Sequence, residues 1–276
     1  MKRDIRMIGL DLDGTLLNDK KEITPYTRDV LKAAIEQGVH VLIATGRPFS
    51  AIDAELAMFP EMRYAVTSNG ARIVDVKNNR TLYESTMSGA KAVEVLDKIQ
   101  EYDMVCEIFT EGDGYSSIPN LERIGEFFDT PEMIDYVRRT RVPIDDVRRV
   151  ALREGVSIEK LHLIFNDLDA RKKVKEIISQ IEGVTVTGAF PNTIETLNAG
   201  TSKAEGLLKL GRILGIEREQ IMVCGDGMND YEMIEKSGFG VAMANGNPKV
   251  KAIADYVTVS NNEDGVAKAI EKFVLK

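Results

Sequence analysis

The chain has 276 residues, of which 43% are hydrophobic and 29% charged, an ordinary composition for a globular protein with a sizeable core. This length suits one large α/β domain or two modest ones. The net charge of −8 argues against a nucleic-acid partner, because phosphate backbones attract surplus lysine and arginine. A small phosphorylated ligand is compatible with this charge, because a few cations and a metal ion can reverse the field inside a cleft.

The cysteines and the apolar runs bear on the location of the protein. Two cysteines, Cys106 and Cys224, are too few for a disulfide framework in a chain of this size. The N-terminal segment lacks the apolar stretch of a signal peptide, and no run reaches the roughly 18 apolar residues of a membrane span. We therefore expect a reducing, cytoplasmic location and no membrane partner. No feature of the sequence indicates an oligomeric state.

The first third of the chain alternates predicted strands with predicted helices. A helix is expected to begin at Thr24-Pro25, with the threonine as N-cap and the proline in the first turn, and to end at Gly38. Residues 72–76 and 81–84 have the pattern of a hairpin. Apolar runs that end in turns are typical of buried parallel strands. Such runs are found at residues 5–12, 39–44 and 64–67.

The last third resumes the alternation of strand and helix. Ser202 and Glu205 form an S-x-x-E capping box that opens a helix, which we expect to stop at Gly215. Alternating strands and helices imply a parallel, doubly wound sheet. The remaining strands are expected at residues 221–224, 239–242 and 256–259, and the remaining helices at 230–236, 248–254 and 263–273.

The middle of the chain has a different pattern, with longer helices at 90–100 and 170–180 among separate strand-like runs. This pattern predicts an α+β domain with an antiparallel sheet, inserted into the first domain. The fold class is therefore α/β, with a doubly wound, mostly parallel core at residues 1–84 and 192–276 and an inserted α+β domain at 85–191. The strand-like runs of the inserted domain cover residues 104–109, 160–165 and 184–187.

The run Asp11-Leu12-Asp13-Gly14-Thr15 follows the first predicted strand. Ligands of doubly wound sheets bind outside the carboxyl ends of the strands, so this position suits a residue that attacks a ligand. Two carboxylates two residues apart allow one to be the nucleophile and metal ligand while the other transfers protons. For this motif alone an ordinary acidic turn is the alternative, because Asp and Gly are common in turns.

Two further segments offer groups that bind phosphate. Thr45 and Gly46, in the run ATGR after the second strand, present a hydroxyl and an unhindered amide before a helix. Lys203 lies in the first turn of a helix, where its charge opposes the helix dipole, and binding phosphate would explain this position. Taken singly, a helix N-cap and a surface lysine are the simpler interpretations of these residues.

The run GDGMND at residues 225–230 follows an apolar strand and places two acids, an amide and two glycines at one turn. Hard oxygen ligands suit Mg²⁺, which usually takes one or two carboxylates together with water and substrate phosphate. A flexible acidic turn is the alternative, although this spacing is unusual for turn chemistry.

Together these segments resemble, in order and spacing, the haloacid dehalogenase superfamily of phosphohydrolases, and within it the Cof-like subfamily with a large α+β cap. The resemblance covers nearly the whole chain. It implies a Mg²⁺-dependent phosphatase of small phosphorylated metabolites, sugar phosphates favoured, whose cap at 85–191 selects the substrate. The sequence departs from the family's pattern at Thr201, where relatives often have valine, and at Ala204, where they often have glycine. The motifs that carry the resemblance are DLDGTLL at 11–17, ATGR at 44–47, SNGA at 68–71, Lys203 and GDGMND at 225–230.

The resemblance also implies a role for each site residue. Asp11 is expected to be the nucleophile and a metal ligand, and Asp13 the general acid/base, with its main-chain carbonyl on the metal. Asp226 is expected to complete the protein's ligands to Mg²⁺. The residues implied in phosphate binding are Leu12 through its amide, Thr45, Gly46, Lys203 and Asn229. The supporting residues are Asp230, which would position Lys203 or metal-bound water, and Arg47 and Asn69, which would lie near the cap and the substrate.

Charged residues of the inserted domain allow two interpretations. Arg141, with Arg138 and Arg139, could neutralise an acidic group of a substrate, but such a cluster is more often a solvated helix face, and we expect the latter. His162 lies in a predicted strand and is expected to be a packed histidine. Glu107 could contact a sugar.

The motifs are also compatible with two other functions. A phosphomutase similar to the phosphomannomutases of the same superfamily also has a cap and a second acid, and would depend on a bisphosphorylated activator. A non-catalytic binding module would use the cap as an interaction surface, but a degenerate site is expected to have lost at least one of Asp11, Asp13, Lys203 and Asp226.

Overall fold

The structure is a computed structural model that describes residues 2–188 and 190–275. These residues divide into two compact units. The first unit extends to Arg47 and also contains Ile52–Tyr83 and the chain from Ser202 onward, whereas the second contains Pro48–Ala51 and Glu84–Thr201. None of the helices in this described part of the chain combines the length and apolar character that crossing a membrane requires.

An eight-stranded sheet forms the centre of the first unit. Its strands are β1 Met7–Leu10, β2 His40–Ala44, β3 Tyr64–Thr67, β4 Arg72–Asp75, β5 Arg80–Glu84, β13 Ile221–Gly225, β14 Phe239–Ala242 and β15 Tyr256–Val257. Their order is β15-β14-β13-β1-β2-β3-β4-β5. The strands from β15 to β3 are parallel and β4 is antiparallel to β3, which confirms the predicted mostly parallel, doubly wound sheet.

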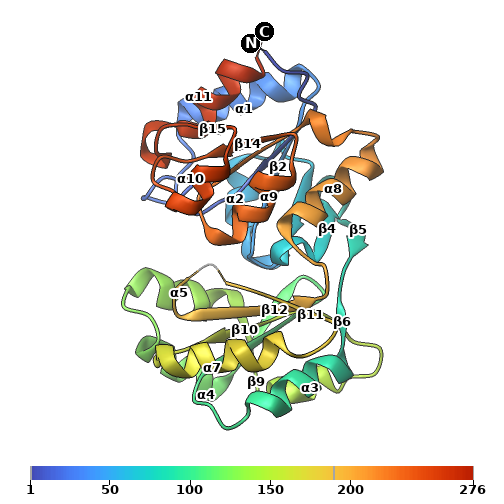
Figure 1. The fold of residues 1–276 in the computed structure, drawn as a ribbon, viewed down its shortest axis with the longest axis vertical. Helices are drawn as coiled ribbons and strands as arrows, with labels where there is room; N and C mark the ends of the chain where they lie inside the picture. Colours follow the sequence, from blue (N-terminus) through green and yellow to red (C-terminus); the bar gives the residue numbers. More distant parts are fainter. Residues whose placement is uncertain (1, 189, 276) are drawn as a thin grey trace. The chain divides into compact units, whose positions relative to one another are not determined.

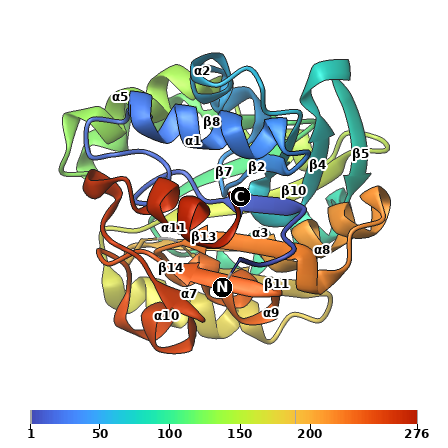
Figure 2. The same cartoon turned by 90° about the horizontal axis from the view of Figure 1, so that it is seen from above.

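Helices cover both faces of this sheet. They are α1 Pro25–Glu36, α2 Asp53–Met58, α8 Lys203–Leu214, α9 Tyr231–Lys236, α10 Pro248–Ile253 and α11 Gly265–Phe273. Figure 2 shows α1 and α11 side by side on one face, and α8, α9 and α10 on the other, where their apolar side chains join the core of the sheet. Both predicted N-caps are confirmed, because the Thr24 side chain accepts the N–H of Thr27 and the Ser202 side chain accepts the N–H of Glu205. The second half of the predicted capping box stays a prediction, and the Glu205 carboxylate pairs with Lys236.

A seven-stranded sheet forms the centre of the second unit. Its strands are β6 Met87–Ser88, β7 Val105–Thr110, β8 Asp113–Ser117, β9 Arg141–Ile144, β10 Ser157–Ile164, β11 Val184–Thr187 and β12 Thr193–Asn198. They run in the order β11-β12-β10-β7-β8-β9, with β6 also paired to β10. All of these pairs are antiparallel except β8–β9, so the sheet is mixed rather than wholly antiparallel as predicted.

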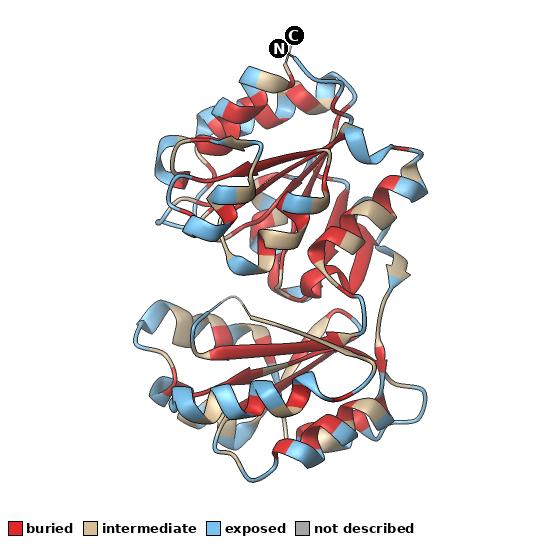
Figure 3. Cartoon of the chain, viewed as in Figure 1, coloured by how far each residue is buried: buried red, intermediate tan, exposed pale blue. Residues whose placement is uncertain are grey.

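The helices of the second unit pack on both faces of its sheet. They are α3 Gly89–Ile99, α4 Ile118–Arg123, α5 Pro131–Thr140, α6 Val147–Ala151 and α7 Leu168–Ser179. Apolar residues of α3, α6 and α7 form one core with the sheet, whereas α5 contributes to a smaller core around Val105 and Ile164. Figure 1 shows α3 and α7 on the same side of this sheet. The strands of both units are mostly buried, and the longer helices, such as α3 and α8, bury one stripe and expose the other (Figure 3).

The second boundary of the inserted domain lies later than the predicted residue 191. β12 pairs with both β10 and β11, so the second unit continues to Thr201. The stretch TIETLN at 193–198 is a strand of this sheet, and the chain turns away only at Gly200, whose φ is +74°. Pro48–Ala51 also belongs to this unit, where the Ser50 N–H donates to the Gly112 carbonyl over 3.0 Å.

The expectation that Arg141 lies on a solvated helix face is wrong, because it begins β9 and is only 7% exposed. Its guanidinium donates to both carboxylate oxygens of Glu107, over 2.9 and 3.1 Å. The Nδ1 atom of His162 lies 2.9 Å from the same carboxylate. Burial alone would raise the pKa of Glu107, but Arg141 and then His162 outweigh burial and hold this pKa at about 2.

The Glu107→Gln variant is expected to be less stable at pH 7 by about 3 kcal/mol, because it leaves the buried Arg141 without its anionic partner. The folded-state pKa of Glu107 lies below that of the unfolded chain. Its contribution is therefore complete above about pH 4.5 and is lost as the pH falls toward 2. Denaturant unfolding of wild type and variant across this range should show the difference shrinking with acid. Glu122→Gln, at an exposed position of α4, is the matched control, and an equal effect there would contradict the prediction.

Candidate active site

The site residues of the first unit follow neighbouring strands of its sheet. Asp11 follows β1, Thr45 follows β2, and Asp226 follows β13. The register pairs Leu10 with both Cys224 and Ile43, so these strands end at the same edge of the sheet. The predicted segments therefore meet at the carboxyl ends of parallel strands, where doubly wound sheets bind their ligands.

Lys203 joins two of the predicted acids. It is the first residue of α8, and its side chain is fully buried. Its Nζ atom donates to Asp11 Oδ1 over 2.6 Å and to Asp230 Oδ1 over 2.7 Å. Burial would lower the pKa of Lys203, but the two carboxylates outweigh burial and raise it. The lysine is therefore a permanent cation beside Asp11, not the solvated surface residue of the simpler interpretation.

Asp11, Asp226 and Asp230 form an acidic cluster, in which one oxygen of each lies within 4.8 Å of the others. Burial first, and the nearby charge of Asp230 second, raise the pKa of Asp11 well above its usual range. The same two causes raise the pKa of Asp226 to about 6. Lys203 supplies one positive charge for these three carboxylates, so the cluster favours a further cation.

Asp230 organises the turn that carries Asp226. Its Oδ2 atom accepts the backbone N–H groups of Asp226 over 3.0 Å and Gly227 over 2.9 Å. Thr15 donates its hydroxyl to Asp226 Oδ1 over 3.0 Å, which ties the first motif to the last. Asn229 lies half-buried in the 3₁₀ turn Met228–Asp230 between these acids and α9.

The carboxylate of Asp13 points to cations rather than into the acidic cluster. Arg47 donates to both of its oxygens over 2.8 to 3.1 Å, and Lys21 Nζ lies 2.7 Å from Oδ1. Burial would raise the pKa of Asp13, but Arg47 and then Lys21 outweigh burial and lower it. In this arrangement Asp13 is ionised at neutral pH and can accept a proton. Asp13 can carry a proton at neutral pH only after it loses its contacts with Arg47 and Lys21.

The second and third motifs form one packed turn. The Asn69 N–H donates to the Thr45 carbonyl over 3.0 Å, and the Ser68 N–H donates to the Arg47 carbonyl over 2.9 Å. A Cβ atom at Gly46 would lie 3.0 Å from Asn69 Oδ1, so a larger residue would crowd the turn. Thr45 and Asn69 are both buried here, and Leu12 is fully buried behind Asp11.

Three contact residues of this site were not predicted. Lys21 forms an ion pair with Asp13, and Glu55 forms one with Arg47. Thr15 donates a hydrogen bond to Asp226. Thr15 belongs to the DLDGT run, so its place in the motif was a usable signal. Lys21 and Glu55 lie in segments without a recognisable pattern, and only the fold brings them to the site. The predicted contacts of Arg47 and Asn69 with substrate stay predictions.

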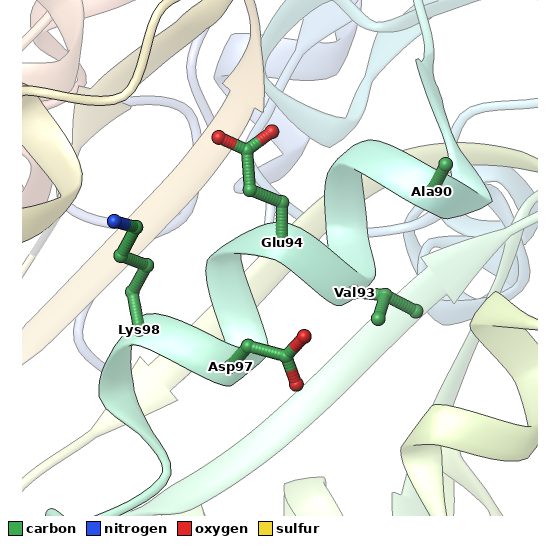
Figure 4. Close-up of a pocket in the computed structure, with 5 residues that line it drawn as sticks. All are labelled: Ala90, Val93, Glu94, Asp97 and Lys98. Carbon is green, nitrogen blue, oxygen red and sulfur yellow. The ribbon is translucent and has the colours of Figure 1, made fainter.

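A hollow of about 510 Å³ lies along α3 in the second unit, far in sequence from these motifs. Figure 4 shows the side chains of Glu94, Asp97 and Lys98 standing out from this helix. Glu94 already pairs with Lys91, and Asp97 with Arg148, both over 2.6 Å. Two of the three charged side chains that line this surface are acidic, which makes it a poor match for a phosphate.

A doubly wound sheet with these acids at the ends of its strands, this lysine at the start of α8 and an inserted α+β unit is the arrangement of a class of phosphohydrolases. The profile of the haloacid dehalogenase-like hydrolases matches residues 8–270, and the chain belongs to this family. It is a phosphatase of phosphoric monoesters that acts on small phosphorylated metabolites.

Relatives and solved structures match along nearly the whole chain. The 5-amino-6-(5-phospho-D-ribitylamino)uracil phosphatase YcsE of Bacillus subtilis is 33% identical over 272 residues, 99% of this chain and 97% of its own. YitU of the same organism, a phosphatase named for the same substrate, is 30% identical over a match that covers 97% of each chain. BT1666 of Bacteroides thetaiotaomicron, a phosphatase of the haloacid dehalogenase superfamily, superposes with a TM-score of 0.81 at 27% identity, covering 99% of this chain and 96% of its own. The subclass IIB sugar phosphatase BT4131 superposes with a TM-score of 0.83 at 26% sequence identity, and the match covers 98% of this chain and 100% of its own.

Proposed function

We propose that this phosphatase depends on Mg²⁺ and hydrolyses sugar phosphates and related polyol phosphates through an aspartyl-phosphate formed on Asp11. The observation that carries the proposal is the contact of Asp11 with the buried Lys203, over 2.6 Å, inside the acidic cluster. A carboxylate held at a strand end beside a fixed cation is placed to attack a bound phosphate.

The chemistry of the donor atoms fits a magnesium ion. Asp11 and Asp226 offer carboxylate oxygens, which are the hard ligands that Mg²⁺ prefers, and Asp13 would add its main-chain carbonyl. Burial and then the charge of Asp230 raise the pKa values of Asp11 and Asp226, and a bound cation would favour the ionised form of both carboxylates. When bound, Mg²⁺ would neutralise the charge between the anionic nucleophile and the anionic phosphate.

The residues divide the reaction into two steps. Asp11 attacks phosphorus, and the bond from phosphorus to the leaving oxygen breaks while Asp13 gives that oxygen a proton. Asp13 then takes a proton from water, whose oxygen attacks the same phosphorus and releases Asp11 and inorganic phosphate. Lys203, Thr45 and the backbone N–H groups of the strand ends would hold the phosphoryl oxygens in both steps. Before the first step Asp13 must lose the contacts with Arg47 and Lys21 that keep its pKa low.

The preference for sugar and polyol phosphates is supported by the relatives. YcsE and YitU have a phosphorylated ribityl chain in the name of their substrate, and BT4131 is described as a sugar phosphatase. These substrates share a phosphate on a chain of hydroxyl groups. The second unit, whose main stretch Glu84–Thr201 lies between the SNGA motif and Lys203, is the part of the chain that we propose selects among them.

Phosphate release from sugar phosphates, polyol phosphates, nucleotides and an aryl phosphate is expected to require Mg²⁺. A chelator should lower the rate by about 100-fold or more, and added Mg²⁺ should restore it. Sugar and polyol phosphates should give the highest kcat/KM values. Activity that persists in chelator would contradict the role of the metal. Turnover that needs a bisphosphorylated activator would instead favour the phosphomutase.

A further inference from the structure

The loop after β14 contacts both segments that carry the acids of the site. The Asn247 N–H donates to the Asp226 carbonyl over 2.8 Å. The side chain of Asn245 reaches the other segment, where its Nδ2 donates to the Gly14 carbonyl over 2.8 Å. Gly246 lies between these two contacts, and a Cβ there would come within 3.0 Å of Asp226 backbone atoms. One short loop therefore links the segment after β1 to the segment after β13.

Gly14 and Asp226 are themselves in close contact. Gly14 has a φ of +78°, and a Cβ atom on it would lie 2.7 Å from Asp226 Oδ2. The peptide that follows Asp13 therefore lies directly against the carboxylate of Asp226. A rotation of this peptide would move Asp13 or displace Asp226. The Gly14 carbonyl belongs to the next peptide, between Gly14 and Thr15, and the hydrogen bond from Asn245 holds that peptide, which restricts the rotation about Gly14.

The side chain of Asn245 is itself oriented by a buried neighbour. The Asn261 N–H donates to Asn245 Oδ1 over 3.0 Å, so the amide nitrogen of Asn245 faces Gly14. Asn261 is only 6% exposed, and its Nδ2 donates to the Leu17 carbonyl over 3.0 Å and to Asp19 Oδ1 over 3.1 Å. The turn at Asn261 thus fixes Asn245 on one side and the segment from Gly14 to Asp19 on the other.

We propose that Asn245 is a positioning residue of the phosphatase reaction, which holds the Gly14 carbonyl so that Asp13 and Asp226 keep their relative placement. This inference rests on the proposed roles of Asp13 as acid/base and Asp226 as metal ligand. Asn245 is exposed, and its side-chain hydrogen bonds within the described residues go to Gly14 and Asn261 and not to either of these carboxylates, so it acts through the backbone of Gly14.

Two substitutions test whether the hydrogen bond to Gly14, and not merely the presence of a side chain at position 245, is needed for activity. Asn245→Ala removes both of its hydrogen bonds, whereas Asn245→Asp keeps the acceptor for the Asn261 N–H and puts a carboxylate oxygen, which cannot donate, in place of the donor to Gly14. We expect kcat to fall about 10- to 100-fold in both variants, with KM within about threefold of wild type. Full kcat in Asn245→Asp would overturn the proposal, because the donor to Gly14 would then be unnecessary.

Asn262→Ala is the matched control. Asn262 contacts the same segment at its far end, with bonds of 2.8 and 3.0 Å to Asp19, but it does not reach Gly14. We expect this variant to keep the kcat of wild type. A decrease in kcat equal to that of Asn245→Ala would overturn the proposal, because it would mean that any contact holding the segment from Gly14 to Asp19 in place has the same effect.

A calorimetric titration with Mg²⁺ alone tests the proposal without activity. The dissociation constant of Mg²⁺ is expected to rise about tenfold in Asn245→Ala, because Asp226 and the Asp13 carbonyl lose their fixed separation. An unchanged constant and unchanged kcat, together with a lower unfolding temperature, would show that Asn245 only stabilises the fold. If wild type hydrolyses no phosphate ester, the proposed function fails, while this titration still decides whether Asn245 positions the metal ligands.

Discussion

Replacing Asp11 with asparagine is expected to abolish phosphate release, with a loss in kcat of about 10⁴-fold or more. The neutral amide cannot attack phosphorus, and the acidic cluster loses the carboxylate nearest to Lys203. Single-turnover and steady-state assays with an aryl phosphate would measure the loss. Asp29→Asn makes the same chemical change at an exposed position of α1 and should keep full activity.

The Asp11→Asn protein is expected to remain folded. Burial and the charge of Asp230 raise the folded-state pKa of Asp11 above its unfolded value. The ionised carboxylate therefore costs stability at neutral pH in the absence of metal, and this cost disappears only as the pH falls below both values. The unfolding temperature of the metal-free variant should equal or exceed that of wild type. A clear decrease would mean that lost activity reports a damaged fold and says nothing about the nucleophile.

The parallel core and the meeting of its motifs could be predicted from the sequence. Apolar runs such as 221–224 end directly in the acidic or glycine-rich turns, and parallel strands bring those turns to one edge. The pairing of Asp13 with Lys21 could not be predicted, because it depends on a turn in which Lys21 has a φ of +60°. The contact of Asn245 with Gly14 joins residues 231 positions apart, and no local pattern encodes it.

The inserted unit was harder to predict than the core, because its boundaries depend on strand pairing. The run 193–198 reads equally well as a strand of either unit, and only its hydrogen bonds to β10 and β11 assign it to the second. The burial of Arg141 has the same origin. Its neighbours in sequence, Arg138 and Arg139, are exposed at the end of α5, whereas the start of β9 carries Arg141 to Glu107. The exposure of clustered arginines therefore cannot be predicted from the sequence where a helix is followed directly by a strand.

Replacing Lys203 with methionine is expected to damage stability and activity together. The variant leaves Asp11 and Asp230 buried at 7% and 0% exposure without their shared cation. Losing one partner of such a group typically costs about 3–5 kcal/mol, so we expect a loss of that size in metal-free protein at pH 7. The loss should shrink as the pH falls, because protonated carboxylates no longer repel each other.

A second substitution separates the two effects of Lys203. In the double variant Lys203→Met/Asp230→Asn, one of the two uncompensated charges is removed, so part of the lost stability should return. Activity should remain at least about 10³-fold below wild type in both proteins, because neither has the cation that stabilises the transferring phosphoryl group. Denaturant unfolding without metal and phosphate release with Mg²⁺ measure the two quantities independently. Recovery of turnover in the double variant would contradict a direct role of Lys203 in phosphoryl transfer and reduce it to a counter-ion of Asp230.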